Sequence, residues 1–123
     1  MSDVLNRLLG APDLALNLPT KNFELPRLST DGKPFVLKLR ALPWSKAQQL
    51  RQMDGADAQL QVIIASCDDL DRLDASMQDA KAGIMTLEDV LKHKLLPGEI
   101  TRLVMAIDEL NGYRGDYIRE VKN

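Results

Sequence analysis

The residue types that most often carry out chemistry in enzymes are scarce in this chain of 123 residues, which has one histidine and one cysteine. Nucleophilic catalysis needs a general base beside a serine or cysteine, and no spacing ties His93 to Cys67 or to a serine. His93 falls on the polar side of a predicted helix, where a histidine is usually solvated. Cys67 cannot form an internal disulfide, which fits a reducing compartment, and a free cysteine is usually a small buried side chain. We therefore predict no catalytic residues.

Acidic residues cluster at one place in the sequence: Asp68, Asp69, Asp71 and Asp74. A calcium loop needs a central glycine and a terminal glutamate, and this cluster has neither. Negative charges are stabilised in the first turn of a helix, so a helix N-terminus explains the cluster better. The glycines are scattered at predicted helix ends and form no phosphate-binding loop. A site for a transition metal needs several converging histidine, cysteine or carboxylate groups, so we predict no metal, no cofactor and no enzymatic activity.

Exposed apolar side chains are the remaining candidates for a functional surface. Met105 lies opposite the apolar stripe of its predicted helix, and four other residues flank turns or helix ends: Trp44, Met53, Met85 and Tyr113. Methionine is frequent at adaptable binding surfaces, and tryptophan and tyrosine often anchor interfaces. Single exposed hydrophobic residues are also normal on proteins, so core or incidental positions remain the alternative. We predict these five as partner-binding residues.

Residues 91–113 are the stretch around which the other elements are arranged, and they predict a helix, a sharp bend, a second helix and a stop. The second helix, residues 96–110, carries an apolar stripe at helical spacing: Ile100, Leu103, Val104, Ile107 and Leu110. Pro97 suits the first position of this helix because its missing N–H would be unpaired there. Glu99 places a negative charge in the first turn. Gly112 can adopt the left-handed conformation that ends a helix.

Two alternating segments before residue 42 predict a β-hairpin with one face in solvent. Apolar residues recur at every second position: Phe23 and Leu25 in the first segment, and Phe35, Leu37, Leu39 and Ala41 in the second. Between them, Asp31 and Gly32 lie at the centre of a segment with the composition of a tight turn. Pro26 has no N–H for a sheet hydrogen bond, which indicates an edge. Because an isolated hairpin is not stable in water, its apolar face should pack on helices.

The first residues predict a short amphipathic helix that ends at Gly10. Ser2 or Asp3 can cap it, and its apolar residues share one side: Val4, Leu5, Leu8 and Leu9. A helix of this length is marginal alone and must dock on another surface to persist. The linker that follows, residues 11–19, carries alternating leucines, Leu14, Leu16 and Leu18, and either lies extended across the domain or remains mobile.

Side chains typical of helix caps begin the remaining predicted helices: Ser45 with Gln48, Asp57, Asp68 or Asp69, and Thr86 with Asp89. The first of these helices should run to about Met53. The helix after Asp57 has apolar residues on both sides and should be buried on both. The run Val62-Ile63-Ile64 within it is also compatible with a strand, and we favour the helix. Asp116 can cap a final turn that carries Tyr117, Ile118 and Val121.

The order of elements is a short helix, a hairpin and about five helices, which predicts an α+β fold: an N-terminal antiparallel β-hairpin packed on a mainly α-helical domain. We expect a short helix and linker in residues 1–18 and a single domain in residues 19–123. The net charge of −2, without a basic cluster, disfavours nucleic-acid binding. No apolar run approaches the roughly 18 residues that cross a membrane, and the first residues lack the pattern of a secretion signal.

Three segments of the sequence resemble the XkdN-like family of phage tail assembly chaperones. Its members carry a Leu-Pro-Thr-Lys start before a strand, an Arg-Ala-Leu end to the second strand and a Leu-Leu-Pro-Gly-Glu-Ile joint between helices. The corresponding segments here are residues 18–21, 40–42 and 95–100, and the end of the chain from Gly112 to Asn123 is also similar. The resemblance covers roughly residues 18–123. It departs from the family at Lys94, where a leucine is usual, and in residues 51–60, which look shorter.

The resemblance implies a non-enzymatic helper that binds the long, helical and aggregation-prone tape measure protein before the tail tube polymerises around it. It implies a location in the bacterial host cytoplasm and absence from the mature virion. Self-association and contacts with other tail proteins are compatible with that role. Genes of this kind often also produce a longer product by ribosomal frameshifting, which an amino-acid sequence leaves open. The alternative is a structural tail component or another small protein-interaction module.

Overall fold

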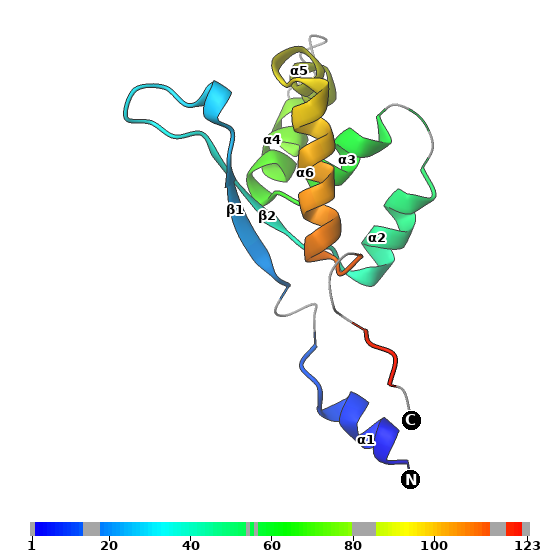
Figure 1. Ribbon diagram of the computed structural model, residues 1–123. Helices are drawn as coiled ribbons and strands as arrows, with labels where there is room; N and C mark the ends of the chain where they lie inside the picture. The colour runs from blue at the N-terminus through cyan, green and yellow to red at the C-terminus, as the bar shows by residue number, and fades with distance from the viewer. Residues whose placement is uncertain are drawn as a thin grey trace.

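The predicted hairpin is present in the computed structural model, which describes residues 2–13, 18–53, 55, 57–79, 86–113 and 118–121 (Figure 1). Strand β1 (Thr20–Glu24) pairs antiparallel with strand β2 (Val36–Arg40). Leu37 and Leu39 of β2 are buried, whereas the residues beside and between them are exposed or half-buried. The hairpin therefore has the one apolar face and the one solvated face that its period-two pattern predicted.

The connection between the two strands contains a helical turn as well as the predicted tight turn. The 3-10 helix η2 (Pro26–Leu28) follows β1, and a single bridge then pairs Thr30 with Lys33. Gly32 has a φ of 68° within this bridge, a conformation that costs glycine little. The sequence predicted Pro26 at an edge of the sheet. In the structure it instead begins η2, because its fixed φ suits the first turn of a helix.

Six α-helices occur in the part of the chain that the structure describes: α1 (Asp3–Gly10), α2 (Trp44–Arg51), α3 (Ala58–Ala65), α4 (Asp68–Asp79), α5 (Leu87–Lys94) and α6 (Pro97–Leu110). Five of them follow the hairpin, so the predicted α+β fold class is confirmed. Residues 62–64 are helical, which resolves the ambiguity between helix and strand in favour of the helix.

The bend between α5 and α6 follows the sequence closely. Leu96 is extended, with φ −70° and ψ 148°, and Pro97 occupies the first helical position, because the proline ring disfavours a helical residue before it. The Glu99 carboxylate accepts a hydrogen bond of 2.7 Å from the Leu96 N–H. Gly112, with a φ of 85°, lies just after the end of α6. This joint fixes the direction of α6 relative to α5.

Helix α3 forms the centre of the core. Its Ile63 is fully buried, and Leu60 and Ile64 are each 2% exposed. Cys67, directly after it, is 1% exposed, as predicted for a structural cysteine. The predicted stripe of α6 belongs to the same core, with two buried members and three partly buried ones: Leu103 and Ile107, and Ile100, Val104 and Leu110. Helix α3 contacts α2, α4, α5 and α6, and these neighbours explain why it has apolar residues on both sides.

Backbone and ionic contacts join the hairpin to the helices at the open end of the strands. The Arg40 N–H donates to the carbonyl of Ser66 at 2.8 Å, and its guanidinium pairs with Asp68 at 2.8 Å. The Leu42 N–H donates to Oδ1 of Asn111, just after α6, at 2.7 Å. Asp68 therefore lies in the first turn of α4 with an ionic partner, as predicted for an acid at a helix N-terminus.

Two predicted helix caps are wrong. Helix α2 begins at Trp44, directly after an extended Pro43, so Ser45 lies inside the first turn and makes no cap hydrogen bond. The helix also ends at Arg51, before Met53. Asp57 does precede α3, but its carboxylate pairs with Nζ of Lys92 at 2.7 Å and makes no cap hydrogen bond. In contrast, Thr86 and Asp89 form the predicted reciprocal capping box of α5.

The two ends of the chain contribute little to the core. The Ser2 hydroxyl caps α1 by accepting from the Val4 N–H at 3.0 Å, as predicted. None of the eight residues of α1 is buried, and Figure 1 shows this helix outside the body of helices and strands. The predicted final turn is absent from residues 118–121, where Ile118 is 93% exposed. Leu14, Leu16, Asp116 and Tyr117 lie outside the described residues.

Candidate partner-binding surface

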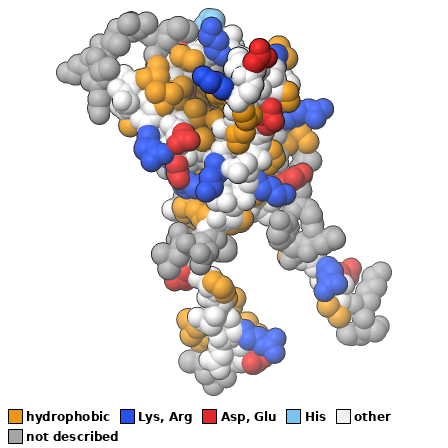
Figure 2. Space-filling view, turned by 90° about the vertical axis from the view of Figure 1, so that its left-hand side faces the viewer, with side chains coloured by type: hydrophobic (Ala, Val, Ile, Leu, Met, Phe, Trp, Pro, Cys, Tyr) orange, Lys and Arg blue, Asp and Glu red, His pale blue; other side chains and the backbone are white. Residues whose placement is uncertain are grey.

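The most apolar of three hollows on the described surface lies between the hairpin and helices α4 and α5. It has a volume of about 380 Å³ and is lined by twelve residues: Leu25, Leu28, Phe35, Leu37, Ile63, Leu70, Leu73, Leu87, Val90, Leu91, Lys94 and Leu95. We call it the apolar groove. Figure 2 views the molecule from the hairpin side and shows hydrophobic side chains gathered on the upper part of the body. Among the residues that line the groove, Lys94 is the only charged one.

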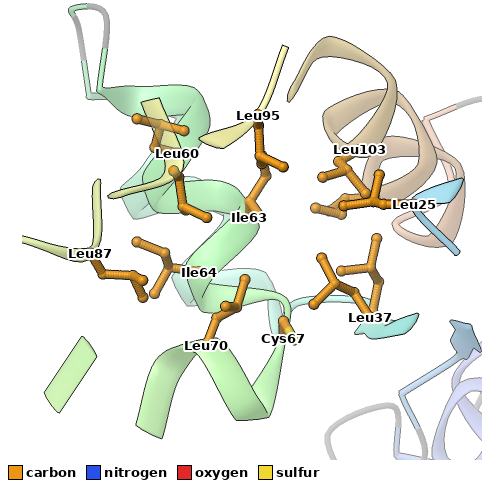
Figure 3. Close-up of a cluster of buried hydrophobic side chains, with 13 residues drawn as sticks. Leu25, Leu37, Leu60, Ile63, Ile64, Cys67, Leu70, Leu87, Leu95 and Leu103 are labelled. Carbon is orange, nitrogen blue, oxygen red and sulfur yellow. The ribbon is translucent and has the colours of Figure 1, made fainter. Parts of the chain in front are cut away.

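The floor of the apolar groove is the core itself, and its rim extends outward from that floor. Ile63 and Leu87 are at most 2% exposed, and Figure 3 shows their side chains among the other labelled core residues. Phe35 is 39% exposed and Leu73 is 47% exposed, and Val90 is half-buried. The groove is therefore an opening of the hydrophobic core to solvent, with apolar side chains as its walls.

Local sequence periodicity explains why the rim is apolar. Phe35 lies two residues before Leu37, so both point to the same face of the hairpin. Leu73 follows Leu70 by three residues on α4, and Val90 follows Leu87 by three residues on α5, so each pair shares a helix face. The apolar face of each element is longer than the neighbouring elements can cover.

Met105 lines a second and larger hollow of about 830 Å³, between α6 and the start of the hairpin connection. Met105 is 37% exposed, and Phe23 and Ala106 also line this α6 groove. At the α6 N-terminus, the Arg27 guanidinium pairs with Glu99 at 2.7 Å. Hydrogen bonds from Arg27 and from the Leu96 N–H hold the pKa of the Glu99 carboxyl below its usual range. This ion pair holds η2 against the N-terminus of α6, at one end of the α6 groove.

Trp44 and Tyr113 line a third hollow, of about 490 Å³, which we call the Trp44 groove. Trp44 is 77% exposed and Tyr113 is 46% exposed. The Arg51 guanidinium lies over the Tyr113 ring, 4.4 Å from its centre, a favourable cation–π distance. Leu18, near the end of the N-terminal linker, lines the same groove. The groove thus joins α2 to the segment that follows α6.

The structure does not bring the five predicted site residues together. Met105 lines the α6 groove, whereas Trp44 and Tyr113 line the Trp44 groove. Met53 is 41% exposed after the end of α2 and lines none of the three hollows. Met85 lies outside the described residues. The structure therefore supplies two separate surfaces where the sequence suggested one set of candidates.

Sequence reasoning missed the rim of the apolar groove. It assigned Phe35 to the apolar face of the hairpin that should pack on helices, and in the structure this side chain is exposed, as is Leu73 on α4. A periodicity pattern shows which side of an element is apolar but not how far its neighbours extend over that side. A useful signal was present in the length of the patterns. The alternation of apolar residues runs from Phe35 to Ala41, so it extends beyond strand β2 (Val36–Arg40) at both ends.

The residues first considered for chemistry, His93 and Cys67, lie in different surroundings. His93 is exposed in the last turn of α5, with Nδ1 2.7 Å from the Asp89 carbonyl oxygen. Cys67 is buried in the core. Within the described ranges, no three histidine, cysteine or acidic residues are grouped so that they could hold a metal ion. Of the helices that the structure describes, none has the length and apolarity needed to span a membrane.

Comparison with known proteins gives one result. No curated protein and no solved structure matches this chain. The sequence does match the family described as phage XkdN-like tail assembly chaperone proteins, over residues 46–122. That range begins inside α2 and includes all of α3, α4, α5 and α6, and it covers more than half of the chain. The protein therefore belongs to the family of XkdN-like phage tail assembly chaperones.

Proposed function

We propose that this protein is a non-catalytic chaperone that binds the tape measure protein during phage tail morphogenesis. It acts in the bacterial host cytoplasm and is absent from the mature virion. The observation that carries this proposal is the family match over residues 46–122, which identifies a tail assembly chaperone. We propose the tape measure protein as the partner because the resemblance to this family implies binding to this long, helical and aggregation-prone protein before the tube encloses it.

The surface supports this role physically. Amphipathic helices bind in hydrophobic grooves through side chains spaced by three and four residues. The apolar groove offers such a surface, with Phe35 and Leu73 exposed at its rim and a single lysine among its lining residues. Its volume of about 380 Å³ lies within the range of roughly 300–1,000 Å³ found for ligand pockets. We propose it as the main contact for an apolar helix face of the tape measure protein.

The residues predicted from the sequence complete this proposal as secondary contacts. Met105 in the α6 groove and Trp44 with Tyr113 in the Trp44 groove are exposed, and we propose them, with Met53 and Met85, as further partner-binding residues. Several weak contacts along one long partner raise the overall affinity, because each additional contact is intramolecular. A long helical partner could also hold several copies of the chaperone in this way.

Co-expression with the tape measure protein encoded nearby tests the proposal. The wild-type chain should raise the soluble fraction of the tape measure protein and co-purify with it. Leu73→Asp should reduce both effects because it places a charge on the groove rim. Ala75→Asp is the matched control, since Ala75 is also exposed on α4 but does not line the groove. No complex and unchanged solubility with the wild-type chain would rule out this function.

A structural tail component is the competing function, and purified particles distinguish it. Mass spectrometry of mature tails should detect at most trace amounts of this chain if it is an assembly chaperone. Abundant and constant copies per tail would instead assign it to the finished structure.

A further inference from the structure

Helix α1 is an amphipathic helix of which no residue is buried against the described part of the chain. On a helical wheel its apolar side chains occupy one arc of roughly 140°, with Val4, Leu8 and Leu9 at 66%, 68% and 74% exposed. Asp3 and Arg7 form an ion pair of 3.2 Å on the opposite side. The apolar face therefore carries no charge, and all of its polar character is directed away from it.

A helix of eight residues is too short to be stable in water by its own hydrogen bonds. The α1 sequence nevertheless has a working N-cap at Ser2 and an internal ion pair, so its local features favour a helix. Such a helix gains most from binding a concave apolar surface. The apolar groove is more apolar than the α6 groove and the Trp44 groove, and it offers exposed Phe35 and Leu73 as contacts.

We propose that α1 of one copy of this protein binds in the apolar groove of a second copy. The course of the connecting chain favours the second copy over the same one. Nine residues, 11–19, join α1 to β1, and nine residues span at most about 30 Å. The groove begins at Leu25, beyond the opposite end of β1, which itself is about 17 Å long. The linker is therefore long enough to reach either groove, but to reach its own groove α1 would have to reverse its direction and more than half of the linker would have to run back along β1.

The position of α1 agrees with an exchange between copies. In Figure 1 it lies outside the body, beyond the end of β1 at which the linker enters. A second copy can present its groove to this helix without any reversal of the linker. The four apolar side chains of α1 then cover the exposed rim, and Lys94 can extend its aliphatic stem along the bound helix with its charge in solvent.

This contact gives the groove an occupant before its client is present. If the tape measure protein binds in the same groove, as proposed above, it displaces α1 and converts self-associated chaperone into client-bound chaperone. That consequence rests on the proposed function, whereas the association between copies does not. The two ideas are tested separately, because the association is measured with the pure chaperone alone.

Sedimentation velocity or light scattering of the full chain over a range of concentrations tests the contact. The wild-type chain should form dimers or larger species, and Leu8→Asp should raise the dissociation constant at least about tenfold. Asn6→Asp, which adds the same charge on the polar side of α1, should leave it unchanged. Leu73→Asp should weaken association as Leu8→Asp does, and Ala75→Asp should not. Circular dichroism checks that each variant remains folded.

Mixing the two impaired variants provides the decisive measurement. Leu8→Asp retains an intact groove and Leu73→Asp retains an intact helix, so together they can form one α1–groove contact that neither forms alone. A one-to-one complex in the mixture supports exchange between copies. A wild-type chain that is monomeric at all concentrations would overturn the proposal, and so would association that Leu8→Asp leaves intact. Failure to bind the tape measure protein would affect only the proposed function.

Discussion

Helices α1 and α5 have the same length and similar local sequence features, but only α5 is part of the core. Each has eight residues, a hydroxyl side chain at its N-cap, an acidic first turn and a basic last turn. In α5, Leu87 is 2% exposed and Leu91 is 8% exposed, whereas Leu8 in α1 is 68% exposed. Capping and amphipathic spacing thus specify that a helix forms. Whether its apolar face is buried depends on what the rest of the chain places opposite it.

The largest expected difference between the two helices is in core stability. Leu87→Ala should lower the free energy of unfolding by about 2–5 kcal/mol, because it removes buried methyl groups and leaves a cavity. Leu8→Ala should change it by less than about 0.5 kcal/mol, as expected for an exposed position. Urea unfolding followed by circular dichroism, at a protein concentration at which the chain is monomeric, measures both. Equal losses for the two variants would mean that α1 packs on the core of its own chain and that the comparison is mistaken.

Removing the caps should give a smaller difference. The Thr86 hydroxyl accepts from the Asp89 N–H at 3.1 Å, and Thr86→Ala should cost about 1 kcal/mol of global stability. Thr86→Ser keeps the hydroxyl and is the control. Ser2→Ala removes the equivalent cap of α1, so it should lower helix content at the N-terminus without shifting the unfolding midpoint. Amide hydrogen exchange separates the local effect from the global one.

The ion pair between Arg27 and Glu99 should make α6 docking sensitive to acid. Hydrogen bonding by Arg27 keeps the pKa of Glu99 below its ordinary value of 4.5. A carboxyl with a lowered pKa in the folded state stabilises the protein fully above the ordinary pKa. This stabilisation is lost as the pH falls through the lowered pKa. Glu99→Gln should therefore lose stability less steeply than wild type below about pH 4.5, in urea unfolding at several pH values.

Arg27→Gln serves as the matched variant for this acid response, because it removes the main partner that lowers the pKa and leaves the carboxyl and its hydrogen bond from the Leu96 N–H in place. It should flatten the pH dependence in the same direction, but by less than Glu99→Gln does. The Asp3–Arg7 pair of α1 joins two residues of one helix and connects it to nothing else. If Arg27→Gln keeps the wild-type acid response, the ion pair is not its source.

The smallest expected effect on stability comes from Met105, on the exposed side of α6. Met105→Asp should change the melting temperature little, because Met105 is 37% exposed, and it should weaken binding of the tape measure protein. Leu103→Ala, on the buried side of the same helix, should cost about 2–5 kcal/mol. Thermal unfolding and a pull-down assay compare the two. A large loss of stability with Met105→Asp would show that Met105 acts as a core residue.

The local features of the fold were largely predictable from the sequence. The Asp31–Gly32 turn, the bend at Pro97 and the Thr86–Asp89 capping box depend on residues close together in the chain. The Ser45 cap failed because Pro43 is extended and occupies the N-cap position, so the helix begins two residues earlier than a Ser45 cap would place it. Asp57 failed for a different reason, since a lysine far along the chain pairs with it. Local patterns are reliable until a more favourable partner comes from another element.

The candidate binding surface was less predictable. Trp44, Tyr113 and Met105 are exposed in hollows, but the sequence did not show that they line two different ones. The apolar groove escaped notice because its rim residues continue patterns that normally mark a core. Exposure of Phe35 is decided by how far α4 and α5 extend over the hairpin, which is a property of three elements at once.

The sequence by itself determined the order of helices and strands, their apolar faces, the sharp joint before α6 and the family. Each of these depends on the chemistry of neighbouring residues or on their spacing along one element. Only the tertiary structure decided which apolar faces are covered: it buried Leu87 and left Leu8 and Leu73 in solvent. Burial requires surfaces from separate elements to meet at van der Waals distance, and no single segment of sequence specifies that.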